Sequence, residues 1–144
     1  MHANQHIAGI DKVVNVLGYW PTFHDAEVVS FQAERALPVV KDKTVARMSV
    51  HVRHYETVGE GTANFEQVLR QSALINFVFI GACEFELSGF NHQNVINSIA
   101  VSPMQSGADN ALFVDIDSIW GFGGTLQCSS VSVDAVDLPL NGAA

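Results

Sequence analysis

The densest group of ionisable side chains lies early in the chain, where His24, Asp25 and Glu27 fall within four residues. Imidazole and carboxylate groups are common zinc ligands and common general acids and bases. On an extended strand Asp25 and Glu27 would share one face and His24 the other, because side chains alternate along a strand. The three can meet at one metal ion only if the backbone bends there. We therefore favour a structural role, in which His24 and Asp25 cap a turn before a strand, and expect no metal or cofactor.

Two pairs of carboxylates lie farther along, in segments with the alternation of β-strands. Asp115 and Asp117 project from one face of their segment, and Glu84 and Glu86 are spaced in the same way. Paired carboxylates can do acid–base chemistry when one pKa is raised, but nothing in the sequence supplies a group that would raise it. An exposed acidic face is the simpler interpretation. The four carboxylates form one patch if their strands are neighbours.

The net charge of −8 is unevenly distributed along the chain. All seven Lys and Arg residues lie before residue 71, whereas residues 71–144 contain seven acidic residues. A surface built from this half repels phosphate and attracts basic partners. Nucleic acid is therefore not expected as a ligand, because binding it depends on Lys and Arg. The alternative is an acidic surface that only keeps the protein in solution.

Motifs of the common enzyme classes are absent from the sequence. No nucleophile elbow, HExxH, phosphate-binding loop or dinucleotide fingerprint occurs, and residues 121–124 are typical of a turn between strands. Cys83 and Cys128 lie too far apart for a CxxC motif, which favours two buried thiols, with a disulfide between adjacent strands as the alternative. Trp20 and Trp120 are candidate interface anchors, although a core position is commoner for single tryptophans beside strands.

The elements that must position these residues are mostly strands. Apolar residues at helical spacing from Ile7 to Leu17, followed by Gly18, predict an N-terminal helix and then an aromatic turn. Period-2 alternation predicts six strands, with Val29 and Phe31 on one face of the first and a bend or bulge at Gly81 in the third. The strands are expected at about 27–34, 44–56, 74–88, 95–102, 112–120 and 125–136, with a loop at 58–64 and a short helical turn at 65–72.

This pattern predicts a mostly β fold in a single β-rich domain, residues 1–144. An antiparallel β-sandwich or open barrel of about six long strands, with one N-terminal helix, fits it best. No apolar stretch reaches the roughly 20 residues that span a bilayer, so no membrane partner is expected. The N-terminus lacks the features of a signal peptide, which favours a cytoplasmic location. A homodimer is an open alternative, because 48% of the residues are hydrophobic and a strand face could be buried between subunits.

The segment from Leu17 to Val28, LGYWPTFHDAEV, resembles the opening of the immunity protein 50 family. These are small bacterial proteins predicted to protect a cell from its own polymorphic toxins. A Trp-Pro-x-Phe-His-Asp-Ala-Glu stretch leads into the first strand of the family, and residues 85–96 and 126–136 are similar to later strands. The resemblance implies a mostly β fold, no known catalytic activity and no catalytic residue. The residues that fill the turn motif here are Trp20, Pro21, Phe23, His24, Asp25, Ala26 and Glu27.

Three hypotheses follow. The first is a non-enzymatic immunity-type protein that binds and neutralises a cognate toxin through an acidic surface, with Asp115, Asp117, Glu84 and Glu86 as contacts. A basic nuclease is one such toxin, because an acidic inhibitor can mimic its substrate. The second is a small-ligand or metal-binding enzyme centred on the His24, Asp25 and Glu27 cluster. The third is an oligomeric β module.

Overall fold

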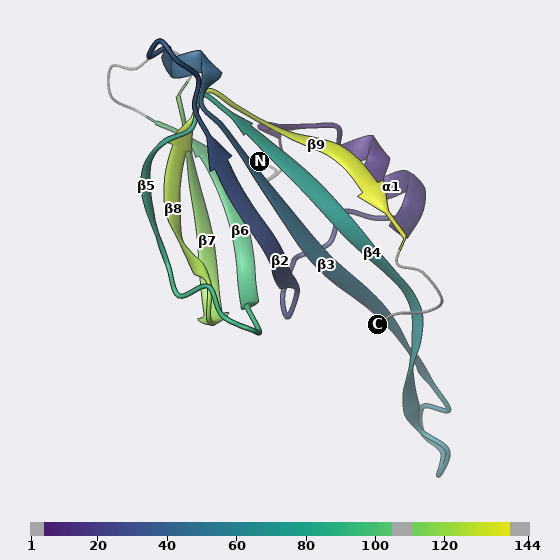
Figure 1. Ribbon diagram of the computed structural model, residues 1–144. Helices are drawn as coiled ribbons and strands as arrows, with labels where there is room; N and C mark the ends of the chain where they lie inside the picture. Colours follow the sequence, from purple (N-terminus) through teal and green to yellow (C-terminus); the bar gives the residue numbers. More distant parts are fainter. Residues whose placement is uncertain (1–4, 105–110, 139–144) are drawn as a thin grey trace.

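The computed structural model describes residues 5–104 and 111–138. These residues form an open mixed β-sheet of nine strands, one α-helix and a short 3-10 helix (Figure 1). The strand order is β1-β9-β4-β3-β2-β6-β7-β8-β5, and only the β1–β9 pair is parallel. The elements are β1 (Ile7–Ala8), α1 (Ile10–Leu17), β2 (Glu27–Glu34), η1 (Lys41–Lys43), β3 (Val45–Val58), β4 (Glu66–Ile80), β5 (Cys83–Ser88), β6 (Val95–Pro103), β7 (Leu112–Trp120), β8 (Gly123–Cys128) and β9 (Ser130–Asp137).

The mostly β class is confirmed, but six strands in a sandwich or barrel is wrong. Two predicted strands are each broken in two. The 74–88 strand breaks at Gly81, where the backbone turns with a φ of 68° and β4 gives way to β5 at the far edge of the sheet. The 125–136 strand breaks at Ser129, between β8 and β9. The two breaks lie against each other: the Ser129 N–H donates to the Ile80 carbonyl at 2.8 Å, and a Cβ on Gly81 would lie 2.5 Å from the Ser129 hydroxyl oxygen.

The sheet has two halves, β1-β9-β4-β3-β2 and β6-β7-β8-β5, that meet at a short junction. β2 and β6 share one register pair, Glu27 with Val95, and then diverge (Figure 1). Backbone bonds from Val28 N to Asn94 O and from Ile96 N to Ala26 O, both 2.9 Å, extend the contact. The junction is therefore narrow, and side-chain bonding must contribute to it.

Asn94 supplies that bonding. Its amide is buried and makes four hydrogen bonds: Nδ2 donates to the carbonyls of Val28 and Asn91, and Oδ1 accepts from the N–H groups of Asn91 and Phe122. The bonds run from 2.8 to 3.1 Å. One side chain thus ties β2 to the β5–β6 loop and to the turn before β8. All four hydrogen-bonding positions of the amide are used, as burial of a polar group requires.

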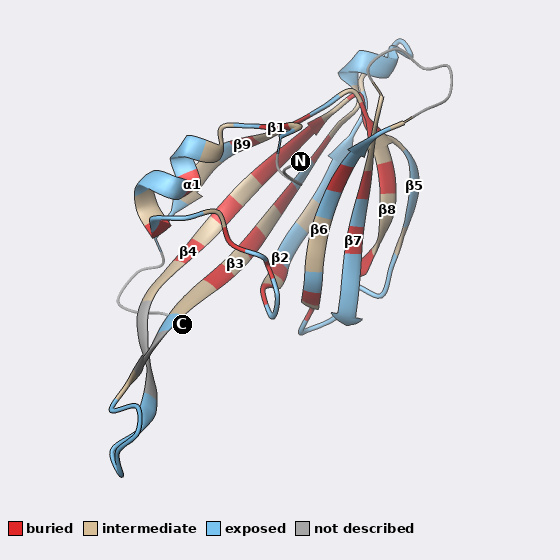
Figure 2. Cartoon of the chain, turned by 180° about the vertical axis from the view of Figure 1, so that it is seen from behind, coloured by how far each residue is buried: buried red, intermediate tan, exposed pale blue. Residues whose placement is uncertain are grey.

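The core lies on one face of the sheet, where buried residues recur at every second position of the central strands (Figure 2). The alternation predicted for residues 44–56 is confirmed, since Ala46, Met48, Val50 and Val52 are buried. α1 lies over β9 and β4 and ends as predicted, with Gly18 in the left-handed region and its N–H bonded to the Val14 carbonyl at 2.8 Å. Its predicted start is wrong, because Ile7 belongs to β1 and pairs with β9.

The face prediction for β2 is also wrong. A bulge between Val28 and Ser30 shifts the register, so Val28 is 2% exposed and Val29 is 53% exposed. Phe31 keeps its inward position and its ring lies 5.3 Å from that of Phe122 and 6.3 Å from that of Phe85. An extra residue in one strand reverses the alternation on either side of it.

The helical turn predicted at 65–72 is a strand instead. β4 begins at Glu66 and pairs with β3 along its whole length, so the two form a long hairpin that extends past the rest of the sheet (Figure 1). The predicted loop between β6 and β7 includes residues 105–110, which lie outside the described residues.

The bulge in β2 can be tested with one pair of identical substitutions. Val28→Ala should lower the free energy of unfolding by about 2 kcal/mol, because it removes two buried methyl groups and leaves a cavity. Val29→Ala should change it by less than about 0.5 kcal/mol. Urea unfolding measures both. Strict alternation without the bulge would give the reverse result.

The junction can be tested at Asn94. Asn94→Ala leaves two carbonyls and two N–H groups without their partner, and we expect a loss of about 3 kcal/mol in the free energy of unfolding. Asn97→Ala, the same change at an exposed asparagine, is the control and should cost under about 1 kcal/mol. Equal losses in the two variants would contradict the role assigned to Asn94.

Candidate partner-binding surface

The predicted acidic residues lie on β5 and β7, which are separated by β8 rather than adjacent. The register pairs Asp115 with Thr125 on β8, and Thr125 with Glu86 on β5. Residues directly opposite each other project from the same face. Asp115, Thr125 and Glu86 therefore form one row across three strands, with Asp117 two positions along β7 on the same side. We call Glu86, Asp115 and Asp117 the acidic face; all three are exposed.

Glu84 is exposed but lies outside this row. A bulge between Cys83 and Glu86 inserts one residue into β5, and Glu84 has a φ of 51° there. Phe85 beside it is 39% exposed, and its ring lies 6.3 Å from that of Phe31. None of β5, β6, β7 and β8 contains a Lys or Arg, so no cationic side chain from these strands neutralises the acidic face.

A polar chain connects the acidic face to the turn motif. The Asn97 Nδ2 donates to Asp117 Oδ2 at 3.0 Å, and its Oδ1 lies 2.9 Å from His24 Nδ1. Since Asn97 Oδ1 can only accept, His24 carries a proton on Nδ1. Its Nε2 lies 3.6 Å from Asp25 Oδ1. Asn97 is the extra residue of a bulge in β6, which aims its amide at both neighbours.

The turn motif itself is held by packing. The Trp20 ring lies 5.3 Å from Phe23 and 6.3 Å from Phe77, and Phe23 is buried. Phe23 and Asp25 both adopt positive φ, and the Asp25 N–H donates to the Ile96 carbonyl at 2.9 Å. The chain thus makes a tight turn that packs Trp20 and Phe23 against the core and leaves His24 and Asp25 on the surface. The side-chain contacts of these two residues run to Asn97 and to each other rather than to backbone groups, so the turn-capping role predicted for them is not the one observed.

The three ionisable residues of the motif do not converge. Glu27 pairs with Arg53 at 3.1 Å, whereas His24 turns to Asn97. His54 is half-buried, and its Nδ1 lies 2.9 Å from the Tyr19 hydroxyl. Across residues 5–104 and 111–138, no three His, Cys, Asp or Glu side chains are grouped as a metal ion would require. This arrangement does not support the enzyme centred on His24, Asp25 and Glu27.

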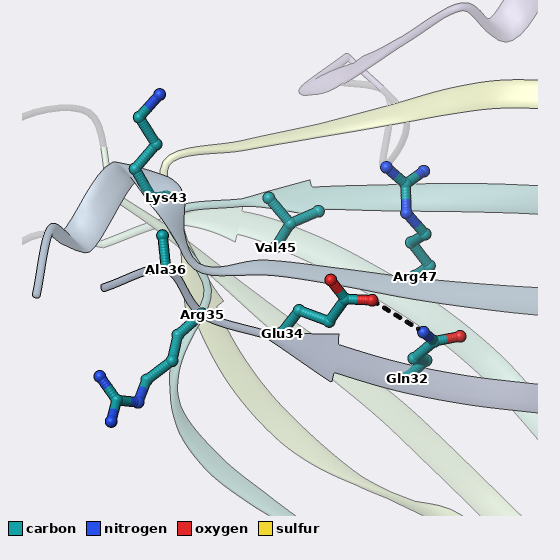
Figure 3. Close-up of a pocket in the computed structure, with 7 residues that line it drawn as sticks. All are labelled: Gln32, Glu34, Arg35, Ala36, Lys43, Val45 and Arg47. Carbon is teal, nitrogen blue, oxygen red and sulfur yellow. Dashed lines mark hydrogen bonds between the residues drawn. The ribbon is translucent and has the colours of Figure 1, made fainter. Parts of the chain in front are cut away.

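Two hollows in the surface lie at opposite ends of β2 and β3. One of about 350 Å³ lies beside the turn motif and is lined by Tyr19, Trp20, His24, Arg53 and Tyr55 among others. Another, of about 200 Å³, lies at the opposite end of β2 and β3 and is lined by several cationic side chains (Figure 3). Figure 3 shows Arg35 pointing away from the side to which Lys43 and Arg47 point, and those two lie at opposite ends of the hollow, so the three do not concentrate positive charge on one ligand.

The two tryptophans have different environments. Trp20 packs against the core, as favoured for both residues, but Trp120 is 46% exposed and rests on His92 with ring centroids 5.5 Å apart. Ile119, the extra residue of a bulge in β7, is exposed beside it. An aliphatic and an aromatic side chain therefore lie at the end of β7, two and three residues from Asp117 respectively. The sequence identified Trp120 as a candidate interface anchor but gave no signal for Ile119, because a bulge cannot be recognised from the alternation.

The cysteines are both free. Cys128 is buried, and burial together with the neighbouring Cys83 raises the pKa of its thiol to about 12. Such a thiol is not reactive at neutral pH. Cys83 is half-buried.

Comparison with known proteins gives one match. The family model described as Immunity protein 50 matches residues 9–138, which is nearly the whole chain. No curated protein and no solved structure was found to match. No helix in the described part of the chain is long and apolar enough to cross a membrane.

His51 gives a pH-dependent test of the sheet next to the motif. It pairs with Glu27 across β2 and β3, and its Nε2 is buried without a hydrogen-bond partner in the described residues. Burial, aided by Arg53 and opposed by Glu27, lowers the pKa of His51 below 6.5. The unfolded chain then binds a proton more readily than the folded protein, so stability should fall as the pH drops below 6.5.

We expect His51→Gln to reduce that fall. Thermal melts of both proteins between pH 8 and pH 5.5 measure it, with the difference at pH 8 as the baseline for the substitution itself. The other histidines are common to both proteins and cancel. Parallel curves would contradict the burial of a neutral His51.

Proposed function

The chain belongs to the immunity protein 50 family, and we propose that it binds and neutralises a bacterial toxin without chemistry of its own. Family membership is the observation that carries this proposal. Such a protein acts by occupying the surface that the toxin needs for its substrate. The toxin would be the cognate partner of a polymorphic toxin system.

We propose that the acidic face is one contact surface. Glu86 and Asp115 lie in one row across β5, β8 and β7, with Asp117 beside them, and all three are exposed. A field of one sign speeds association with a partner of opposite charge and excludes partners of like charge. Exposed Trp120 at the end of β7 adds the kind of side chain that anchors interfaces. Glu84, on the bulge of β5, extends the negative charge to the sheet edge.

The partner we favour is a basic toxin such as a nuclease. Enzymes that hold phosphate groups present cationic clefts, so a carboxylate surface can occupy the same site as the substrate. A non-catalytic role is supported by the turn motif, whose side chains are engaged in packing, in the Glu27–Arg53 pair and in the bond to Asn97. A homodimer stays a prediction that the mass in solution checks.

The charge mechanism can be tested with the toxin polypeptide encoded beside this chain, carrying an inactivating substitution. The double variant Asp115→Lys and Asp117→Lys should bind at least tenfold more weakly at low salt, mainly through slower association. The difference should shrink in high salt, because screening removes the attraction that the variant has lost.

Glu34→Lys with Asp42→Lys is the matched control. It makes the same change in net charge at two exposed residues at the other end of β2, and it should leave binding within about threefold of wild type. An equal loss in both variants would mean that net charge matters rather than the acidic face. No binding by the unaltered protein would overturn the proposed function itself.

A further inference from the structure

The β3–β4 hairpin continues well beyond the strands that flank it. β2 pairs with β3 only as far as His51, and β9 pairs with β4 only as far as Leu74. His51 and Leu74 are themselves opposite each other, so both flanking strands stop at the same rung. Past it the two strands pair on to Val58 and Glu66 without a third strand among the described residues.

The outer part of this hairpin, residues 55–69, is called the arm. It leaves the domain at a bulge between His54 and Tyr55, and the Tyr19 hydroxyl holds His54 just before that point. Four register pairs follow before the tip, which places the tip roughly 14 Å beyond the bulge at the usual rise of a strand. Figure 1 shows the arm projecting past every other element.

The arm carries exposed aromatic side chains that do not contribute to the core of the sheet. Tyr55 is 47% exposed at its base, and Phe65 is 57% exposed beside the tip. A two-stranded ribbon with both edges open is at best marginally stable, and open edges invite unwanted pairing. Large exposed aromatic residues on such an element are typical of a contact surface.

The tip is a defined turn. The Thr62 N–H and hydroxyl both donate to the Gly59 carbonyl, at 3.0 and 2.6 Å, and the Thr62 hydroxyl oxygen accepts from the Asn64 N–H at 3.1 Å. Gly59 has a φ of 67°, and a Cβ there would overlap the Asn64 carbonyl oxygen, so only glycine fits. The turn presents one shape to a partner and reduces the ordering cost of binding.

The arm carries only negative charge. Residues 54–69 contain Glu56, Glu60 and Glu66 and no Lys or Arg. It also points from the end of the sheet at which β2 begins and β7 ends, because one row of register pairs joins His51 to Glu27, Glu27 to Val95 and Val95 to Trp120. Asp117, Trp120 and the exposed part of the turn motif lie at that same end.

We propose that the arm is a second docking element, which enters the positively charged cleft of the toxin while the acidic face contacts its rim. The partner is a basic protein with a concave cationic surface, because a narrow acidic ribbon with aromatic side chains complements such a cleft in shape and charge. This inference rests on the proposed function and locates the part of the chain that occludes the toxin.

The test shortens the arm and leaves the rest of the sheet in place. Replacing residues 56–68 by Asn-Gly joins Tyr55 directly to Leu69, which already face each other, through a turn suited to a two-residue hairpin. With the inactivated toxin polypeptide encoded beside this chain as the probe, the shortened protein should bind at least thirtyfold more weakly. Its thermal unfolding midpoint should stay within a few degrees of the wild-type value.

Point variants keep the test decisive if the shortened protein does not fold. Glu60→Lys with Glu66→Lys, and separately Phe65→Ala, should each weaken binding at least fivefold, while Glu34→Lys with Asp42→Lys serves again as the charge control. Wild-type binding that survives in the shortened protein or in both point variants would overturn the arm proposal alone. Absence of binding by the wild type would instead overturn the proposed function.

Discussion

The buried amide of Asn94 is the interaction on which the two halves of the sheet depend. β2 and β6 share a single register pair, which is the only strand pairing between the two halves among the described residues. The amide bonds to three separate stretches of chain, so the β2 backbone, the β5–β6 loop and the turn before β8 are fixed together. Gly121 must be glycine for this to work, because a Cβ there would lie 2.7 Å from Asn94 Oδ1. A fully satisfied buried polar group sets a unique geometry in a way that apolar packing alone does not.

Local patterns predicted the elements well where one strand stays in one environment. The bounds of β2 and β7 are those predicted, and the helix ends at Gly18 because a left-handed residue is needed there. The same patterns failed where the chain changes partners without changing its alternation. β4 runs into β5, and β8 into β9, with apolar residues on both sides of each break, so the sequence reads as two strands where four exist. The arm was missed because its strands have no core beneath them to impose an alternation.

The candidate surface was predictable in composition but not in geometry. The acidic residues of β5 and β7 were identifiable from spacing, whereas their relation through Thr125 depends on a strand order that no local pattern encodes. Bulges account for most of what was missed: they turn Val29 outward, take Glu84 out of the row, aim Asn97 at His24 and Asp117, and expose Ile119. One inserted residue leaves little trace in a sequence, although it changes the face of every side chain beyond it.

The two breaks at Gly81 and Ser129 lie against each other. Because of them, the strands of one half, β5 to β8, come between β4 and β9 in the sequence, although β4 and β9 are paired in the other half. The half that contains β1, β2, β3 and β4 is completed by β9, which follows the other eight described strands along the chain. Before β9 is synthesised, the edge of β4 that it covers is open. β1 also lacks its partner, because β1 pairs with β9. This half of the sheet is therefore complete only once β9 has been synthesised, and until then the edge of β4 is open to unwanted pairing.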